Sequence, residues 1–161
     1  MPQLVAAWFW SSFAAANGLL VDLPAPDKGD TCSVCGMFVS KYPEWLATVL
    51  YGDGHSDHFD GAKDMFKYLF DLDKYAPGHS YEDISGIGVT EYYGLTMIDA
   101  RQARFVIGSD VTGPMGHELI PLASQEDAEE FMKDHQGEQI LTFDQVSQAL
   151  LQRLDDGALE E

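Results

Sequence analysis

Hydrophobic and polar positions follow a similar order in two stretches of the chain, and each stretch predicts a hairpin followed by a helix. In the first, residues 45–51 (WLATVLY) have the apolar pattern of a strand, residues 52–54 (GDG) supply a turn, and residues 55–59 form a return strand. Asp60 is then expected to cap a helix. The apolar face of this helix recurs at helical spacing and consists of Ala62, Met65, Phe66 and Leu69.

The second stretch repeats this order further along the chain. Residues 103–108 and 117–123 have the pattern of two strands joined by a glycine-rich loop. Ser124 is expected to cap the next helix, Gly137 ends it, and residues 139–143 form a further strand. The sequence therefore predicts an α+β fold of two small ββαβ-like lobes.

A similarity between residues 59–66 and 123–131 favours a duplicated unit of hairpin and helix. A last helix is expected from about Asp144 to Leu154, where apolar residues again recur at helical spacing. The glycine-rich residues between the lobes are interpreted as a connection in which 87–93 are compatible with short strands. The expected boundaries are an apolar N-terminal segment at 1–16, a linker at 17–30, one domain at 31–154 with lobes at about 31–74 and 95–154 and a connection at about 75–94, and an acidic tail at 155–161.

Composition narrows the class of partners. The chain has 161 residues, and a hydrophobic fraction of 45% is enough for a sizeable core. Nine basic residues against 27 acidic ones give a net charge of −18. Such a charge repels phosphate groups, which argues against nucleic-acid binding and against docking on anionic membranes.

The N-terminal apolar run, residues 4–16, has about the length of the central part of a signal sequence and ends in three alanines. It is short for a membrane span. These features favour export, although no Lys or Arg precedes the run. A truncated start, or a helix that associates with a membrane surface, is the alternative.

The first chemical motif is CSVCGM at residues 32–37, which brings the thiols of Cys32 and Cys35 and the thioether of Met37 close together. All three are soft donors, and such donors prefer Cu(I) or zinc to magnesium or calcium. The spacing therefore predicts a metal site. A structural disulfide and a thioredoxin-type redox pair are the alternatives.

The second motif is GPMGHE at residues 113–118, a loop that presents a thioether at Met115 and an imidazole at His117. Residues two apart in an extended segment point to the same side, so both donors can reach one ion, and they suit Cu(I). Glu118 is expected to hold the His117 ring. Taken alone, Met115 is compatible with a core position and His117 with a polar strand start.

Other residues give weaker indications of chemistry. His55 and His58, together with Asp53 and Asp57, predict either a second site for zinc or Cu(II) or simply a polar hairpin turn. No motif of a nucleophile beside a base is present, so an enzyme is not predicted.

Together these motifs resemble the NosL family. The resemblance rests on CxxCGM at 32–37, Tyr42 followed by Pro43, the predicted hairpin leading into FDG at 59–61, and GPMGHELIPLAS at 113–124 with the helix after it. It covers roughly residues 30–145 and implies two small ββαβ-like lobes related to the MerB lyase.

The resemblance also implies a function. NosL proteins are exported accessory proteins that bind Cu(I) for maturation of nitrous oxide reductase, so we expect a periplasmic or cell-surface metallochaperone. The implied partners are that reductase or its copper-site assembly machinery, and a copper-donor protein. The implied copper donors are Met115 and His117, completed by Cys35, Cys32 and Met37.

One feature departs from the family pattern. Many relatives carry a lipid-attachment cysteine after the signal peptide, and no cysteine precedes residue 32 here, so a lipoprotein anchor is not expected. The runner-up function is a thiol redox or organometal-cleaving enzyme that uses the CxxC pair. A binding module with a structural disulfide is the third interpretation.

Overall fold

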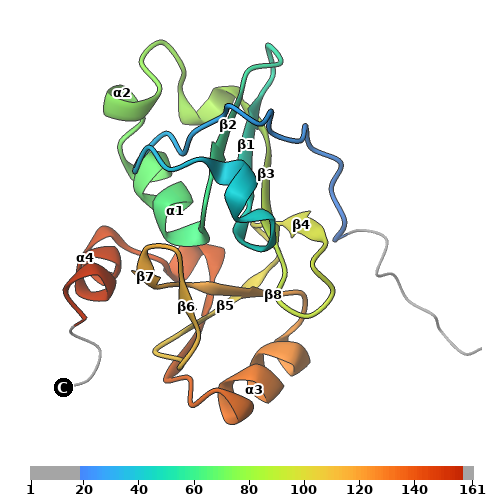
Figure 1. Cartoon of the computed structure of the whole chain (residues 1–161), viewed down its shortest axis with the longest axis vertical. Coiled ribbons are helices and arrows are strands. Elements are labelled where there is room, and N and C mark those ends of the chain that lie inside the picture. The colour runs from blue at the N-terminus through green and yellow to red at the C-terminus, as the bar shows by residue number, and fades with distance from the viewer. Residues whose placement is uncertain (1–18, 158–161) are drawn as a thin grey trace, which may run out of the picture.

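The computed structural model describes residues 19–157, which form two larger antiparallel sheets with helices packed on them and a separate two-stranded hairpin (Figure 1). The apolar segment at 1–16 lies outside the described residues, and no helix within them is long and apolar enough to cross a membrane. The first sheet has the strand order β2-β1-β3-β4. Its strands are β1 (Ala47–Tyr51), β2 (Ser56–Phe59), β3 (Ile84–Thr90) and β4 (Met97–Asp99).

One face of the first sheet is covered by α1 (Ala62–Phe70), which is followed by the short helix α2 (Leu72–Tyr75). Along the β4 edge, Leu20 bridges to Ile98. The glycines Gly86 and Gly88 of β3 leave room for the Leu23 side chain, because a Cβ at either position would collide with it. The described part of the predicted linker therefore packs on the sheet.

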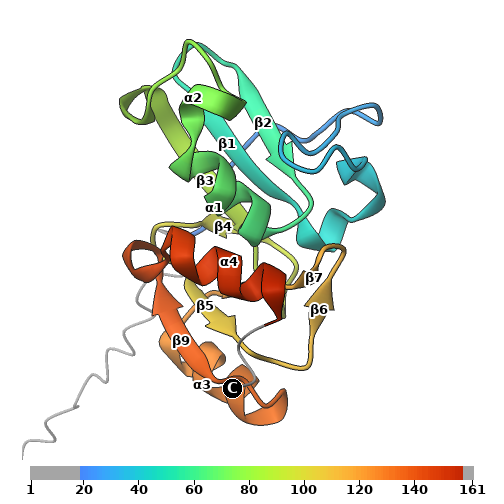
Figure 2. The same cartoon turned by 90° about the vertical axis from the view of Figure 1, so that its left-hand side faces the viewer.

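The second sheet has the order β8-β5-β9, and α3 (Gln125–Asp134) packs on it. In both sheets the first strand of the unit lies between the second and third, and the helix follows the second. A short hairpin of β6 and β7 follows β5, and α4 (Gln148–Asp156) contacts both α1 and β7 (Figure 2). The strands are β5 (Arg104–Ile107), β6 (Thr112–Gly113), β7 (Gly116–His117), β8 (Ile120–Leu122) and β9 (Gln139–Thr142).

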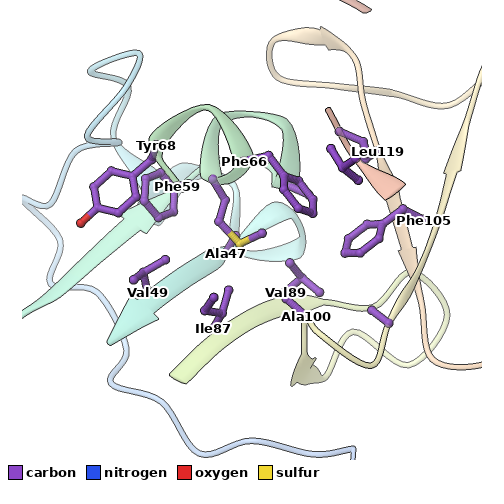
Figure 3. Close-up of a cluster of buried hydrophobic side chains, with 14 of the residues drawn as sticks. Ala47, Val49, Phe59, Phe66, Tyr68, Ile87, Val89, Ala100, Phe105 and Leu119 are labelled. Atoms are coloured by element: carbon purple, nitrogen blue, oxygen red, sulfur yellow. The ribbon is translucent and has the colours of Figure 1, made fainter. Parts of the chain in front are cut away.

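One hydrophobic core joins the two sheets. Phe66 of α1 and Phe105 of β5 meet edge to face with their ring centroids 5.3 Å apart, and buried Leu119 belongs to the same cluster (Figure 3). A smaller cluster lies between α3 and the second sheet and consists of Val106, Ile120, Leu122, Ala128 and Phe131. The mixed α+β class is as predicted, and the two units are fused rather than independent.

Three local expectations differ from the structure. The connection at 75–94 contains β3, an inner strand of the first sheet that overlaps the short strands predicted at 87–93 but begins at Ile84. The glycines of this segment give it the composition of a loop. The last helix begins after Ser147, whose Oγ accepts a hydrogen bond from the Leu150 amide at 3.2 Å, and not at Asp144. It extends to Asp156, so the first residues of the expected acidic tail are helical. Among residues 19–157, short 3₁₀ turns lie at Val39–Lys41, Pro43–Trp45, Tyr81–Asp83 and Phe143–Gln145.

Candidate metal centre

The CSVCGM loop folds back on itself and places both thiols on one side. The Cys32 amide donates to the Met37 carbonyl at 2.8 Å, and the Gly36 amide donates to the Cys32 carbonyl at 2.9 Å. Gly36 has a φ of 79°, the left-handed region that favours glycine. The Cys35 amide also donates to Cys32 Sγ at 3.4 Å, and neither cysteine is in a disulfide.

Two aspartates at the start of α1 face these thiols. Cys35 Sγ donates to Asp60 Oδ1 at 3.3 Å, and Cys32 Sγ donates to Asp64 Oδ2 at 3.4 Å. The four potential ligand atoms of these residues all lie within 4.8 Å of one another. Cys32, Asp60 and Asp64 are buried while Cys35 is partly exposed, so the cluster opens to solvent on the Cys35 side. We call Cys32, Cys35, Asp60 and Asp64 the thiol cluster.

Burial governs the protonation of the thiol cluster. It raises the pKa of the Cys32 thiol to about 11, and it raises the pKa of the Cys35 thiol well above its usual range. Burial likewise raises the pKa of the Asp64 carboxyl. The thiols therefore carry protons in the free protein, and a metal ion that binds here must displace them.

Sequence reasoning missed the role of both aspartates. Asp60 was expected to cap α1, but the N-cap residue is Gly61, and the Lys63 amide donates instead to Glu118 Oε1 at 2.6 Å. Asp60 is thereby free to face Cys35. The available signal was the presence of two aspartates, Asp60 and Asp64, on either side of the start of the predicted helix.

The second predicted motif lies on the hairpin of residues 112–117, here called the Met–His hairpin. Met115 at its tip is 42% exposed, and His117 on β7 is partly exposed. The Lys63 ammonium donates to the Met115 carbonyl at 3.0 Å, so this hairpin contacts the first turn of α1, the turn that carries Asp64 of the thiol cluster. His117 is not a member of that cluster.

Glu118 has a different role from the one expected. Its carboxyl group accepts hydrogen bonds from the main-chain amides of Lys63 and Leu119, at 2.6 and 2.9 Å, and does not hold the His117 ring. Burial raises its pKa to about 8. Met37 lies in the CSVCGM loop and is partly buried.

The histidines of the first hairpin do not converge. His55 Nε2 lies 3.1 Å from Asp57 Oδ2, whereas buried His58 pairs with Thr48 Oγ1 through Nδ1 at 2.9 Å. Within residues 19–157, the thiol cluster is the one group of three or more His, Cys, Asp or Glu side chains whose ligand atoms converge. The polar-turn interpretation of this hairpin therefore fits the structure better than a second metal site.

The fold and this site define a small α+β protein with a free thiol pair placed beside buried carboxylates, a potential metal-binding centre. The model of the NosL family matches residues 24–151. The chain belongs to the NosL family, as its motifs indicated.

Two relatives illustrate this membership. The chain is 29% identical over 124 residues to the copper-binding lipoprotein NosL of Stutzerimonas stutzeri, and the match covers 76% of this chain. The match spans 65% of that relative's length. The crystal structure of the copper chaperone NosL from Shewanella denitrificans superposes with a TM-score of 0.64 at 25% identity, covering 80% of this chain and 97% of that one.

Proposed function

We propose that this chain is a metallochaperone, not an enzyme, that binds Cu(I) and delivers it for assembly of the copper sites of nitrous oxide reductase. The observation that carries the proposal is the pair of free, adjacent thiols of Cys32 and Cys35 in a member of a family whose relatives are named for copper. Thiolate sulfur is a preferred ligand of Cu(I).

The Met–His hairpin supplies the exposed part of the proposed site. Met115 and His117 stand two residues apart and are both accessible, so an acceptor protein can reach an ion held there. Cys32, Cys35 and Met37 are proposed to complete the ligand set or to hold copper further inside. Few, soft ligands favour transfer by ligand exchange because they leave a coordination position open to the acceptor.

The proposed partners are nitrous oxide reductase or its copper-site assembly machinery, and a protein that donates copper. The name of the Stutzerimonas stutzeri relative as a lipoprotein supports a location outside the cytoplasm. The net charge of −18 favours partner surfaces that are basic.

Anaerobic Cu(I) titration of the reduced protein against a chromophoric chelator tests the binding step. We expect one tight Cu(I) per chain, lost in the double variant Met115→Ala/His117→Ala while the fold persists. The double variant Cys32→Ser/Cys35→Ser then shows whether the thiols share that ion. His55→Ala, which removes an exposed imidazole on another hairpin, is the matched control and retains wild-type binding.

The delivery step needs a separate experiment. The Cu(I)-loaded chain is incubated with copper-free nitrous oxide reductase, the proteins are separated, and the copper content of each is measured. We expect copper in the reductase, and less of it when the loaded chain carries Met115→Ala.

A wild-type chain that takes up no Cu(I) in competition with the chelator overturns the proposal.

A further inference from the structure

Lys63 is an unusual residue for a protein interior because its side chain is only 1% exposed. A buried ammonium is costly unless it is paired and hydrogen-bonded. Here Nζ donates to the Met115 carbonyl at 3.0 Å and lies 3.2 Å from Asp155 Oδ1 on α4. One side chain of α1 therefore joins the Met–His hairpin to the last helix.

The main chain of Lys63 contacts the same hairpin region a second time. Its amide donates to Glu118 Oε1 at 2.6 Å, and Glu118 directly follows β7. Lys63 thus contacts the tip of the Met–His hairpin through Nζ and the residue at its base through the amide.

The hairpin has few backbone pairings of its own. Only two residue pairs join its strands, Thr112 with His117 and Gly113 with Gly116. A two-stranded hairpin this short is marginally stable in water, so contacts with the rest of the protein must hold its shape. Besides Lys63, α4 packs against β7.

Asp155 connects Lys63 to the thiol cluster. Its Oδ2 lies 2.6 Å from Lys67 Nζ, and Lys67 Nζ lies 3.8 Å from Asp64 Oδ1. A continuous row of alternating charges therefore runs from the buried carboxylate beside Cys32 to the lysine that holds Met115.

We propose that Lys63 is the positioning residue of the Met–His hairpin, with Asp155 as its counter-ion. It holds the backbone that presents the Met115 thioether and the His117 imidazole, so that both donors are in place before an ion arrives. This inference rests on the proposed function, in which these two residues bind Cu(I). Preorganised donors lose less conformational freedom on binding, and the expected result is slower release of the ion.

The test compares Lys63→Met with Lys133→Met in the full chain. Lys133→Met is the matched control because it removes an exposed ammonium on α3 and leaves the hairpin, Asp155 and the thiol cluster unchanged. Amide hydrogen exchange of residues 112–117, apart from Pro114, is measured by NMR in the copper-free proteins, and Cu(I) release to a chelator is measured anaerobically.

We expect Lys63→Met to raise both the hairpin exchange rates and the Cu(I) release rate by about 10-fold, with the same copper stoichiometry. Lys133→Met should change both rates less than about twofold. Lys63→Arg should restore part of the slow release, because it keeps a cation that donates hydrogen bonds. If Lys63→Met acted only by lowering the global stability of the protein, Lys63→Arg would not restore slow Cu(I) release. Amide exchange would then also rise throughout the protein and not in the hairpin alone.

Two further results decide whether Lys63 orders the hairpin. If Lys63→Met does not fold, Asp155→Asn weakens the same contact from the α4 side and should produce the same changes with smaller size. Hairpin exchange and Cu(I) release that are equal in Lys63→Met and Lys133→Met overturn the role of Lys63. If the wild-type chain takes up no Cu(I), the proposed function fails, whereas the hydrogen-exchange comparison still decides whether Lys63 orders the hairpin.

Discussion

The thiols of buried Cys32 and partly exposed Cys35 donate hydrogen bonds to aspartates and lose much of their contact with water, and both features oppose ionisation. With the pKa of Cys32 raised to about 11 and that of Cys35 raised further by burial, little thiolate exists at pH 8. We expect iodoacetamide to modify these cysteines roughly 100-fold more slowly than free cysteine, because the thiolate is the nucleophile. Mass spectrometry of timed samples at pH 8 measures the rates.

The same experiment in 6 M urea is the control, since an unfolded chain restores ordinary thiol reactivity. Alkylation of the folded protein as fast as free cysteine would contradict the prediction. It would also favour the runner-up function, a thiol redox or organometal-cleaving enzyme, which requires an activated thiolate.

His58 predicts a dependence of stability on pH. Burial lowers the pKa of this ring below its ordinary value of 6.5, so the unfolded chain binds the proton more readily than the folded one. His58 should therefore leave the free energy of unfolding unchanged above about pH 6.5. Below that pH it should make the free energy of unfolding fall as the pH is lowered through the folded pKa. Urea unfolding between pH 5.5 and 7.5 should show a shallower decline in His58→Gln than in the wild type.

Gln139→Ala is the control, because it changes an exposed side chain of β9 that carries no titratable group. Its pH dependence should stay close to that of the wild type. Equal slopes in His58→Gln and the wild type would exclude His58 as the source of the decline.

At the scale of elements, α1 depends on an acceptor from a distant part of the chain. Glu118 accepts the Lys63 amide at the first turn of α1, and both groups are buried. Glu118→Ala leaves that donor without a partner and should lower the free energy of unfolding by about 1–3 kcal/mol. Glu118→Gln should lower it less, since the amide oxygen can still accept. Chemical denaturation monitored by circular dichroism measures both values.

Glu130→Ala, at an exposed position of α3, serves as the control and should change stability by less than about 0.5 kcal/mol. Gly61→Ala tests the contact between Glu118 and the Lys63 amide in a second way, because a Cβ at Gly61 would collide with the Glu118 carboxylate. A fully stable Glu118→Ala variant would show that α1 does not need this acceptor.

At the scale of the whole molecule, the core shared by the two sheets predicts a single unfolding transition. Phe66 packs against Phe105 and Phe143, and thus connects α1 to β5 and to the turn before α4. Phe66→Ala should lower the free energy of unfolding by about 3–5 kcal/mol while unfolding stays cooperative. Coincident transitions by far-UV circular dichroism and tryptophan fluorescence test this.

Phe131→Ala provides the comparison in the smaller cluster beneath α3. It should also be destabilising, again with one transition, because the second sheet contributes to both clusters. Two separated transitions in either variant would mean that the sheets fold as independent units.

Much of this protein is determined by the sequence by itself. Local patterns predicted the first hairpin and α1, since such patterns depend on neighbouring residues. These were the apolar pattern of residues 45–51, the turn at 52–54 and the helical spacing after Asp60. The CSVCGM and GPMGHE motifs likewise identified the family. Local patterning gave only part of β3, because its glycines have the composition of a loop and just residues 87–93 were compatible with short strands.

Only the tertiary structure decided the surroundings of the motifs. Asp60 and Asp64 lie beside the thiols, Glu118 replaces Asp60 at the start of α1, and Lys63 links that helix to the Met–His hairpin. Lys63 and Glu118 are 55 residues apart, and no periodicity or turn signal relates positions so distant. Their pairing follows from how the two sheets and α4 close over a common core, where each buried polar group must find a partner.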